Sequence, residues 1–243
     1  FNEVVDLDAA AEITVYLDAK GATGLTPIGR ADITTVSGVS QATVNYQVTE
    51  GDASARLSVN SIAITSADFT KLKDALDYNA NSAVSLARQG GTDLVDNTNL
   101  VIETTRPIIG KIFSAYANDT YGEGALIPVS VNFFNGSVAG GSEDVTLSGG
   151  SITLTMNTGA SVTISTVDDA DIGSGTYTVV TGDTETNSLV ASTMALGTAV
   201  IVDDFKNILS SSTIPADNFS SGTNNAIVID VTKPSIQTIS ARR

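Results

Sequence analysis

The side chains that could do chemistry in this chain are mostly carboxylates. The 243 residues include 27 Asp and Glu but neither His nor Cys. This composition excludes Ser-His-Asp and Cys-His nucleophile systems and zinc sites built from imidazole or thiolate. This composition does not exclude a catalytic pair of carboxylates of the kind that glycosidases use. Sugar sites commonly use aromatic platforms, however, and the chain has no Trp and only 5% aromatic residues. We therefore expect that the protein is not an enzyme.

Oxygen ligands point to calcium as the one cofactor that this composition favours. Asp168, Asp169 and Asp171 lie close together ahead of Gly173, like the start of an acidic calcium loop. The twelfth position counted from Asp169 is Val180, which excludes an EF-hand. A solvated acidic hairpin turn is the alternative interpretation of this segment.

The charge balance limits the partners. Twelve Lys and Arg against 27 Asp and Glu give a formal net charge of −15. Such a chain repels phosphate backbones and anionic lipid headgroups, so neither nucleic acid nor a membrane is an expected partner. Residues 1–17 lack the pattern of a signal peptide, and no apolar run approaches a membrane-spanning length. We expect a mature or excised segment whose export signals lie elsewhere.

The composition predicts an all-β fold. Val, Ile, Leu and Ala supply most of the 42% hydrophobic residues, and Thr, Ser, Gly and Asn are abundant. The helix formers Lys, Arg, Glu, Gln and Met are scarce. A core of small, often β-branched side chains is therefore expected.

An internal repeat is the most informative feature of the sequence. Residues 97–108 read NTNLVIETTRPI and residues 224–235 read NNAIVIDVTKPS. Pro107 and Pro234 lie at an offset of 127 residues (234 − 107). Each segment is an apolar strand followed by an acid, a Thr, a base and a proline.

Two further pairs of segments belong to this repeat. Residues 44–52 (VNYQVTEGD) resemble residues 175–183 (GTYTVVTGD). Residues 13–17 (ITVYL) resemble residues 129–133 (VSVNF) more weakly, which leaves residues 142–167 as an extra hairpin inserted in the second copy. Generic similarity among β-rich sequences is the alternative to a true duplication.

The repeat sets the expected domain organisation. Residues 1–105 form a first module with an incomplete start, residues 106–232 form a second module with the inserted hairpin, and residues 233–243 begin a third module or a tail. The prolines restrict Arg106 and Lys233 to extended backbone, so the linkers should be stiff.

The repeat also predicts equivalent core positions. Tyr46 and Tyr177 should occupy the same strand position in the two copies. Val48 and Val179 should lie two residues later on the same face.

Two short helices are predicted, each in the connection before the last strand of a module. Residues 66–76 (SADFTKLKDAL) combine a Ser cap with apolar residues spaced three and four apart. Residues 203–209 (DDFKNIL) are the expected counterpart.

These motifs together resemble the immunoglobulin-like, cadherin-like repeats of giant bacterial surface adhesins. The segments that carry the resemblance, in addition to 177–183, are ETTRP (103–107), DVTKP (230–234), YGEG (121–124), the strand 127–133, LDY (76–78) and residues 90–97. The resemblance implies two tandem immunoglobulin-like β-sandwich modules in an extracellular, cell-surface protein.

The resemblance also implies a calcium site at the module junction. In cadherin-like repeats, carboxylates gather where one module meets the next. The matching candidates are Glu103, Asp119, Glu123, Asp203 and Asp204. Ordinary solvated acids on an acidic protein are the alternative.

The expected function is structural or adhesive. The chain would act as a stiff spacer or as a subunit of a fibre or surface layer, with copies of itself or neighbouring repeats as partners. The alternative is a binding module that recognises a glycan or another surface protein through the hairpin of the second module.

Overall fold

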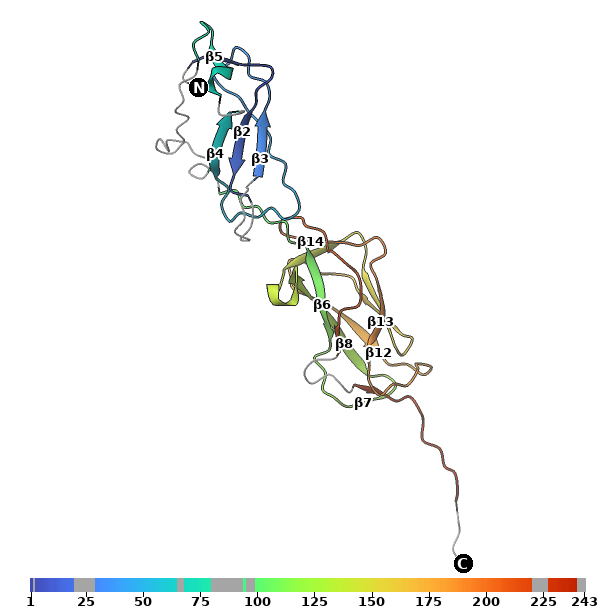
Figure 1. Cartoon of the computed structure of the whole chain (residues 1–243). Coiled ribbons are helices and arrows are strands. Elements are labelled where there is room, and N and C mark those ends of the chain that lie inside the picture. The colour runs from blue at the N-terminus through green and yellow to red at the C-terminus, as the bar shows by residue number, and fades with distance from the viewer. Residues whose placement is uncertain are drawn as a thin grey trace, which may run out of the picture. The chain divides into compact units, whose positions relative to one another are not determined.

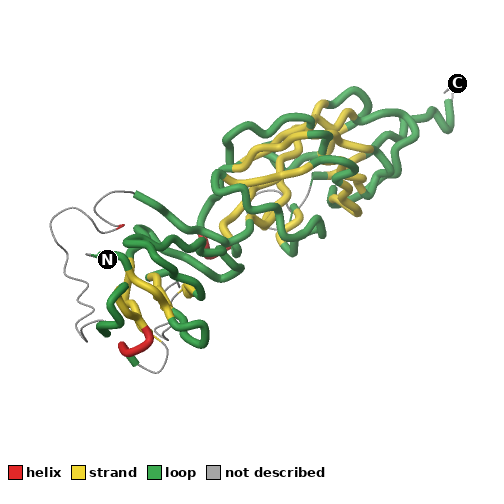
Figure 2. Tube along the Cα trace, turned by 90° about the horizontal axis from the view of Figure 1, so that it is seen from above, coloured by secondary structure: helices red, strands yellow, loops and turns green. Residues whose placement is uncertain are grey.

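The protein is all-β, as the composition predicts. The computed structural model describes residues 1, 3–19, 29–64, 68–79, 94, 99–219 and 227–239. The chain divides into two compact units, which we call unit 1 (Phe1–Thr104) and unit 2 (Thr105–Arg243). Figure 2 shows strands and loops with only short helical turns. None of the helices in the described ranges is long and apolar enough to span a membrane.

Unit 2 contains most of the regular structure (Figure 1). Its strands are β6 (Pro107–Phe113), β7 (Thr120–Tyr121), β8 (Leu126–Asn135), β9 (Val145–Ser148), β10 (Ile152–Met156), β11 (Ser161–Ile164), β12 (Ile172–Thr178), β13 (Ala191–Ala195), β14 (Val200–Asp203), β15 (Asp217–Asn218) and β16 (Val228–Ile229). A 3-10 turn, η3, spans Val138–Gly140. The sheet orders are β12-β8-β6-β15, β11-β10-β13, β14-β9 and β16-β7.

Strand β8 is central to the core of unit 2. Its residues alternate in the way a strand with one buried face requires, and Ile127, Val129, Val131 and Phe133 are fully buried. They join β10, β11 and β14 side chains in one hydrophobic cluster. A cluster of this size removes enough apolar surface from water to be the main stabilising feature of the unit.

Two glycines of β12 let the chain pass close to β11. Gly173 and Gly175 pair with Val131 and Val129 of β8. A Cβ atom at Gly175 would lie 2.6 Å from the carbonyl oxygen of Thr163, and one at Gly173 would lie 2.6 Å from a methyl group of Val167. The missing side chains therefore make room for the neighbouring backbone and core.

Within its described residues, unit 1 has fewer strands than unit 2, and its core is divided. Its elements are β1 (Val5–Leu7), β2 (Ile13–Leu17), β3 (Gly29–Ile33), β4 (Val59–Ile64), the 3-10 turn η2 (Phe69–Lys71) and β5 (Leu72–Asp74). The sheet orders are β3-β2-β4 and β1-β5. The buried residues form two separate clusters, one around Ile13 and Leu72 and the other around Leu17 and Leu57.

The strand pairings of unit 1 recur in unit 2. β2 lies between β3 and β4 as β10 lies between β11 and β13, and β1 pairs with β5 as β9 pairs with β14. The register shifts before the last residue of the central strand in both cases, between Tyr16 and Leu17 and between Thr155 and Met156. A shared irregularity at the same place indicates one architecture used twice.

The last strand closes both units in the same way. Ser54 and Ile102 form an antiparallel bridge in unit 1, and Thr186 and Ile229 form one in unit 2. The next rung is also shared. The Leu57 N–H donates to the Leu100 carbonyl at 2.8 Å, and the Leu189 N–H donates to the Ile227 carbonyl at 2.9 Å. In both units these bonds join the residues just after the first repeat segment (44–52 or 175–183) to the second repeat segment (97–108 or 224–235).

The structure corrects one part of the repeat alignment. Residues 13–17 form β2, whose counterpart by pairing is β10 and not the segment 129–133 within β8. Consequently the hairpin β10–β11 has a counterpart in β2–β3 and is not specific to unit 2. The weak sequence match failed because any alternating apolar strand resembles any other.

The predicted helices are also corrected. Residues 65–67 lie outside the described residues, and the described remainder of 66–76 has one 3-10 turn followed by β5. Asp203 is the last residue of β14, and residues 204–209 form a tight turn after it, in which Lys206 adopts a φ of 69°. The apolar spacing arose from strand ends and exposed turn residues, since Leu76 and Phe205 are both exposed.

Candidate functional site

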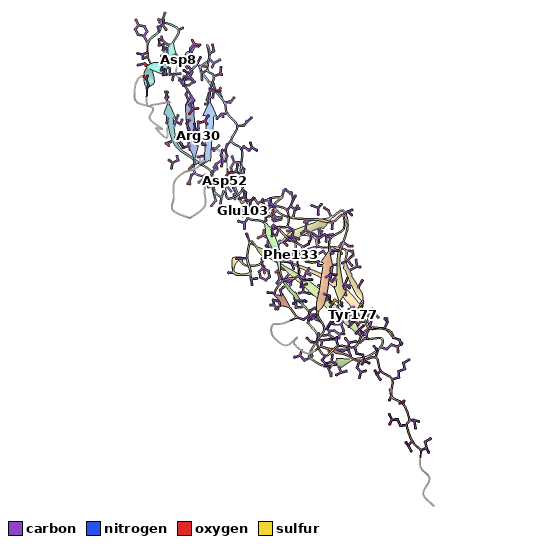
Figure 3. The ribbon with its side chains drawn as sticks, turned by 45° about the vertical axis from the view of Figure 1, so that its right-hand side comes forward. Asp8, Arg30, Asp52, Glu103, Phe133 and Tyr177 are labelled. Carbon is purple, nitrogen blue, oxygen red and sulfur yellow. The ribbon has the colours of Figure 1, made fainter. Side chains whose placement is uncertain are left out.

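A Tyr–Asp turn occurs once in each unit. In unit 2, the Tyr177 hydroxyl donates to Oδ2 of Asp183 at 2.7 Å, and the Val180 N–H donates to the same oxygen at 2.9 Å. In unit 1 the Tyr46 hydroxyl and the Thr49 N–H donate to Oδ2 of Asp52. Figure 3 labels Asp52 and Tyr177, one from each turn.

Backbone conformation allows this turn to close. Gly51 and Gly182 precede the two aspartates with φ values of 90° and 116°, in the region that favours glycine. Burial, and then the hydrogen bond to Asp52, raises the pKa of Tyr46 to about 12. Burial and Asp183 likewise raise the pKa of Tyr177. The Tyr–Asp turns are thus structural, with phenols that stay protonated.

The resemblance between residues 44–52 and 175–183 did not by itself reveal the bond between the tyrosine hydroxyl and the aspartate. The signal was present, because each aspartate follows a tyrosine by six residues in both copies. The equivalence of Tyr46 and Tyr177 holds, but the residues two positions later differ. Val179 is 1% exposed and Val48 is 47% exposed.

The candidate calcium ligands of unit 2 lie in two separate places. Asp119 and Glu123 flank β7, where the Val228 N–H donates to the Asp119 carbonyl. Asp203 is the last residue of β14 and Asp204 follows it, close to the start of β6, since the Ser210 N–H donates to the Pro107 carbonyl. Figure 1 shows β7 and β14 at opposite ends of unit 2. The seven residues of β6 run between these ends, a length of roughly 20 Å.

The individual carboxylates have partners within the protein. Asp203 is buried and accepts from the Asn207 N–H at 2.8 Å and from the Asn207 side-chain amide at 2.9 Å. Glu123 lies 3.3 Å from the Lys233 ammonium. Hydrogen bonds from the Thr181 side chain and then from Lys233 hold the pKa of Glu123 below its usual value.

The remaining candidates are simpler. Asp119 is exposed and accepts a bond from the Thr120 N–H, Asp204 is exposed, and Glu103 is half-buried in unit 1 beside Ile102. Across the described residues, no group of three or more Asp or Glu side chains is gathered closely enough to hold a metal ion. Calcium binding therefore stays a prediction that the geometry does not strengthen.

The acidic segment 168–171 forms the turn before β12. Asp168 and Asp169 are exposed, and Asp169 adopts a φ of 49°. The Ala170 N–H and carbonyl pair with Val145 of β9. This arrangement matches the solvated-turn interpretation of the segment.

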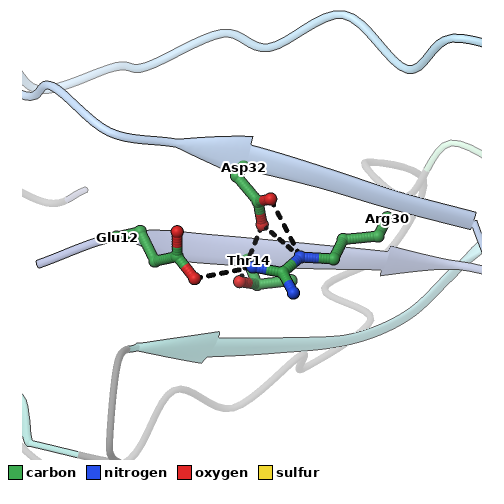
Figure 4. Close-up of polar contacts among 4 residues, drawn as sticks. All are labelled: Glu12, Thr14, Arg30 and Asp32. Atoms are coloured by element: carbon green, nitrogen blue, oxygen red, sulfur yellow. Dashed lines mark hydrogen bonds and ion pairs between the residues drawn. The ribbon is translucent and has the colours of Figure 1, made fainter.

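A charged network on unit 1 joins strands β2 and β3 (Figure 4). The Arg30 guanidinium lies 2.7 Å from Asp32 and 2.6 Å from Glu12, and the Thr14 hydroxyl donates to Asp32 at 2.9 Å. The hydrogen bond from Arg30 lowers the pKa of Asp32. About half of the Arg30 side chain is exposed, so the network contributes little to stability. Its charges are mutually compensated, which is typical of a structural surface cluster.

Comparisons with known proteins add no relative: no family model, no curated protein and no solved structure matches the chain.

Proposed function

We propose that the chain is a structural or adhesive part of a secreted prokaryotic cell-surface protein, built from immunoglobulin-like β-sandwich modules of the cadherin-like type. The observation that supports this most is the repetition of one pairing scheme, down to the register shift in β2 and β10 and the Tyr–Asp turns. Repetition of a whole module extends length and spacing without adding new chemistry.

The connection between the units supports a stiff spacer. Thr104 is bonded within unit 1, because its hydroxyl donates to the Asp52 carbonyl at 2.8 Å. Arg106 is bonded within unit 2, because its carbonyl accepts from the Gly136 N–H at 3.2 Å. Only Thr105 separates them, and Pro107 restricts the backbone of Arg106. A linker this short leaves few backbone dihedrals to vary.

The alternative function, in which unit 2 binds a ligand through its hairpin, was based on the expectation that only the second copy contains this hairpin. The hairpin β10–β11 matches β2–β3, so nothing in its topology sets unit 2 apart as a ligand-binding module. We therefore favour a spacer, or a subunit of a fibre or layer, whose partners are copies of itself or neighbouring repeats outside the cell.

Small-angle scattering of the purified chain tests the spacer. We expect a well-defined maximum dimension that does not change with salt. A variant with a Gly-Ser-rich insertion between Thr104 and Thr105 serves as the flexible control. Equal flexibility of the two proteins would contradict the proposal. The same measurement with and without a chelator tests whether calcium stiffens the chain through Glu103 and the acids of unit 2.

A further inference from the structure

Three asparagines of unit 2 stand in the pattern Asn-X-Ser/Thr, the acceptor motif for N-linked glycosylation of exported proteins: Asn118, Asn135 and Asn218. This pattern arises often by chance in a chain rich in Asn, Ser and Thr, so the sequence alone does not select among the three. An acceptor must present its side-chain amide to an enzyme. The structure separates the three asparagines by this requirement.

Asn218 uses its amide inside the fold. Its Nδ2 donates to the Ala191 carbonyl at 2.7 Å, and its Oδ1 accepts from the Ala191 N–H at 3.1 Å. The next residue, Phe219, is 2% exposed. Transfer of a sugar to this amide would disrupt the two bonds that tie β15 to β13. This motif therefore serves the fold.

Asn135 is half-buried as the last residue of β8. The backbone is held at this point, because the Asn135 N–H donates to the Gly141 carbonyl at 3.0 Å. The N–H of the following residue, Gly136, donates to the Arg106 carbonyl at 3.2 Å. The end of this strand gives an enzyme little room around the amide.

Asn118 lies in the connection between β6 and β7. Residues 115–120 are all exposed, and they include the whole motif 118–120. The Val228 N–H donates to the Asp119 carbonyl at 2.9 Å, which ties this turn to β16. The fold thus presents the motif on an exposed turn at the surface of unit 2.

Two tyrosine rings lie beside this motif. Tyr116 precedes Asn118 by two residues, is 37% exposed, and forms a tilted pair with Tyr121 at 5.5 Å between ring centroids. The Tyr121 hydroxyl donates to the Ala117 carbonyl at 2.9 Å, which fixes the pair to the turn. An aromatic face is a surface on which the C–H groups of a sugar can stack. In a chain without Trp and with 5% aromatic residues, this pair is a second observation that points to a sugar.

We propose that Asn118 is the acceptor of an N-linked oligosaccharide whose first sugar packs on the ring of Tyr116. An oligosaccharyltransferase would supply the sugar from an oligosaccharide linked to polyprenyl diphosphate. The Asn118 amide nitrogen forms the bond to C1 of the sugar. The bond from C1 to the diphosphate oxygen breaks and its electron pair leaves on the diphosphate, while one amide proton passes to a base of the enzyme. The inference rests on the proposed export of the protein to the cell surface and adds a modification site to it.

Transfer in vitro tests the acceptor. The folded chain and three synthetic peptides, one around each motif, are incubated with the lipid-linked oligosaccharide and a transferase that requires only Asn-X-Ser/Thr. Mass spectrometry then locates the sugar. All three peptides should be modified, whereas the folded chain should react at Asn118 about tenfold faster or more than at Asn218, which needs local opening. Thr120→Ala should abolish transfer to Asn118, and Ser137→Ala is the matched control that removes only the Asn135 motif.

A folded chain that accepts no sugar at Asn118 would overturn the proposal, whether or not the peptide reacts. Equal rates at Asn118 and Asn218 in the folded chain would also overturn it, since transfer would then depend on unfolding and not on the exposed turn. Neither result bears on whether the chain is a stiff spacer, which scattering of the unmodified protein measures separately.

The melting temperature of unit 2 tests the packing on Tyr116. The glycan should raise it by about 2 °C in the native chain and not in Tyr116→Ala. Each variant is compared with and without the glycan, so that the loss of the ring contact with Tyr121 cancels. Tyr78→Ala is the control, because Tyr78 is 70% exposed and belongs to unit 1. An equal rise in Tyr116→Ala would overturn the contact between the sugar and this ring.

Discussion

Tyr177 donates a 2.7 Å hydrogen bond from its hydroxyl to the carboxylate of Asp183, six residues later in the chain. Tyr46 makes the same bond to Asp52 in unit 1. In each turn a backbone N–H donates to the same carboxylate oxygen. One aspartate thus fixes a tyrosine ring and a glycine turn together in both units, and the ring is buried in unit 2 and half-buried in unit 1.

Removal of the Tyr177 hydroxyl should lower the stability of unit 2 without creating a cavity in its core. Tyr177→Phe leaves the Asp183 carboxylate short of one donor, so we expect a loss of about 1 kcal/mol in the free energy of unfolding. Tyr177→Ala should cost about 3 kcal/mol or more, because the ring is 1% exposed. Chemical denaturation measures both losses, and Tyr78→Phe is the control because Tyr78 is 70% exposed. Equal stability of all three variants would contradict the assigned bond.

Tyr46 and Tyr177, whose hydroxyls are bonded to aspartates, should also ionise only at a pH above that of an ordinary tyrosine. Of the six tyrosines, Tyr46 has a pKa of about 12 and the pKa of Tyr177 is raised as well, against an ordinary value of 10.0. A pKa raised by folding contributes stability that is present below pH 10 and lost as the pH rises through the folded value. Tyrosinate absorbance should therefore show that Tyr46 and Tyr177 ionise late, together with unfolding. Ionisation of all six near pH 10 in the folded protein would contradict this.

Gly175 should not accept a side chain. A Cβ there lies 2.6 Å from the Thr163 carbonyl oxygen, which is backbone and cannot move aside. Gly175→Val should therefore cost about 1–3 kcal/mol, measured by thermal unfolding. Thr176→Val is the control, since residue 176 is exposed on the same strand. A neutral Gly175→Val variant would show that β11 and β12 are not so close.

Alanine substitutions at the neighbouring residues Asp203 and Asp204 should differ sharply in their effect on the free energy of unfolding. Asp203→Ala removes two bonds to Asn207 at a buried site, with an expected loss of about 1–3 kcal/mol. Asp204→Ala changes an exposed residue and should stay within about 0.5 kcal/mol. If calcium holds this turn, a chelator would reproduce the Asp203→Ala loss in the native protein. If a chelator has no effect, the hydrogen bonds from Asn207, and not a metal ion, account for the contribution of Asp203 to stability.

The all-β class could be predicted from composition because few residues favour helix. The repeats around Pro107 and Tyr177 could be detected in the sequence because the same turn residues, glycine, proline and aspartate, stand at matching positions in both copies. The partner of β2 was not predictable, since alternating apolar residues specify a strand but not its neighbour. The prediction of a helix at residues 203–209 was wrong because these acidic and apolar residues form the end of β14 and the turn after it. The calcium candidates Glu123 and Asp203 belong to the segments at β7 and β14. These strands lie at opposite ends of unit 2, and spacing along the sequence does not reveal such a separation.

Negative-stain electron microscopy of the purified chain tests the proposed structural role most directly. The spacer proposal predicts particles with two lobes at one narrow distribution of separation and angle, or the same lobes joined into filaments or sheets. Lobes that adopt a broad range of angles, with no ordered assembly at any concentration, would contradict a stiff structural repeat.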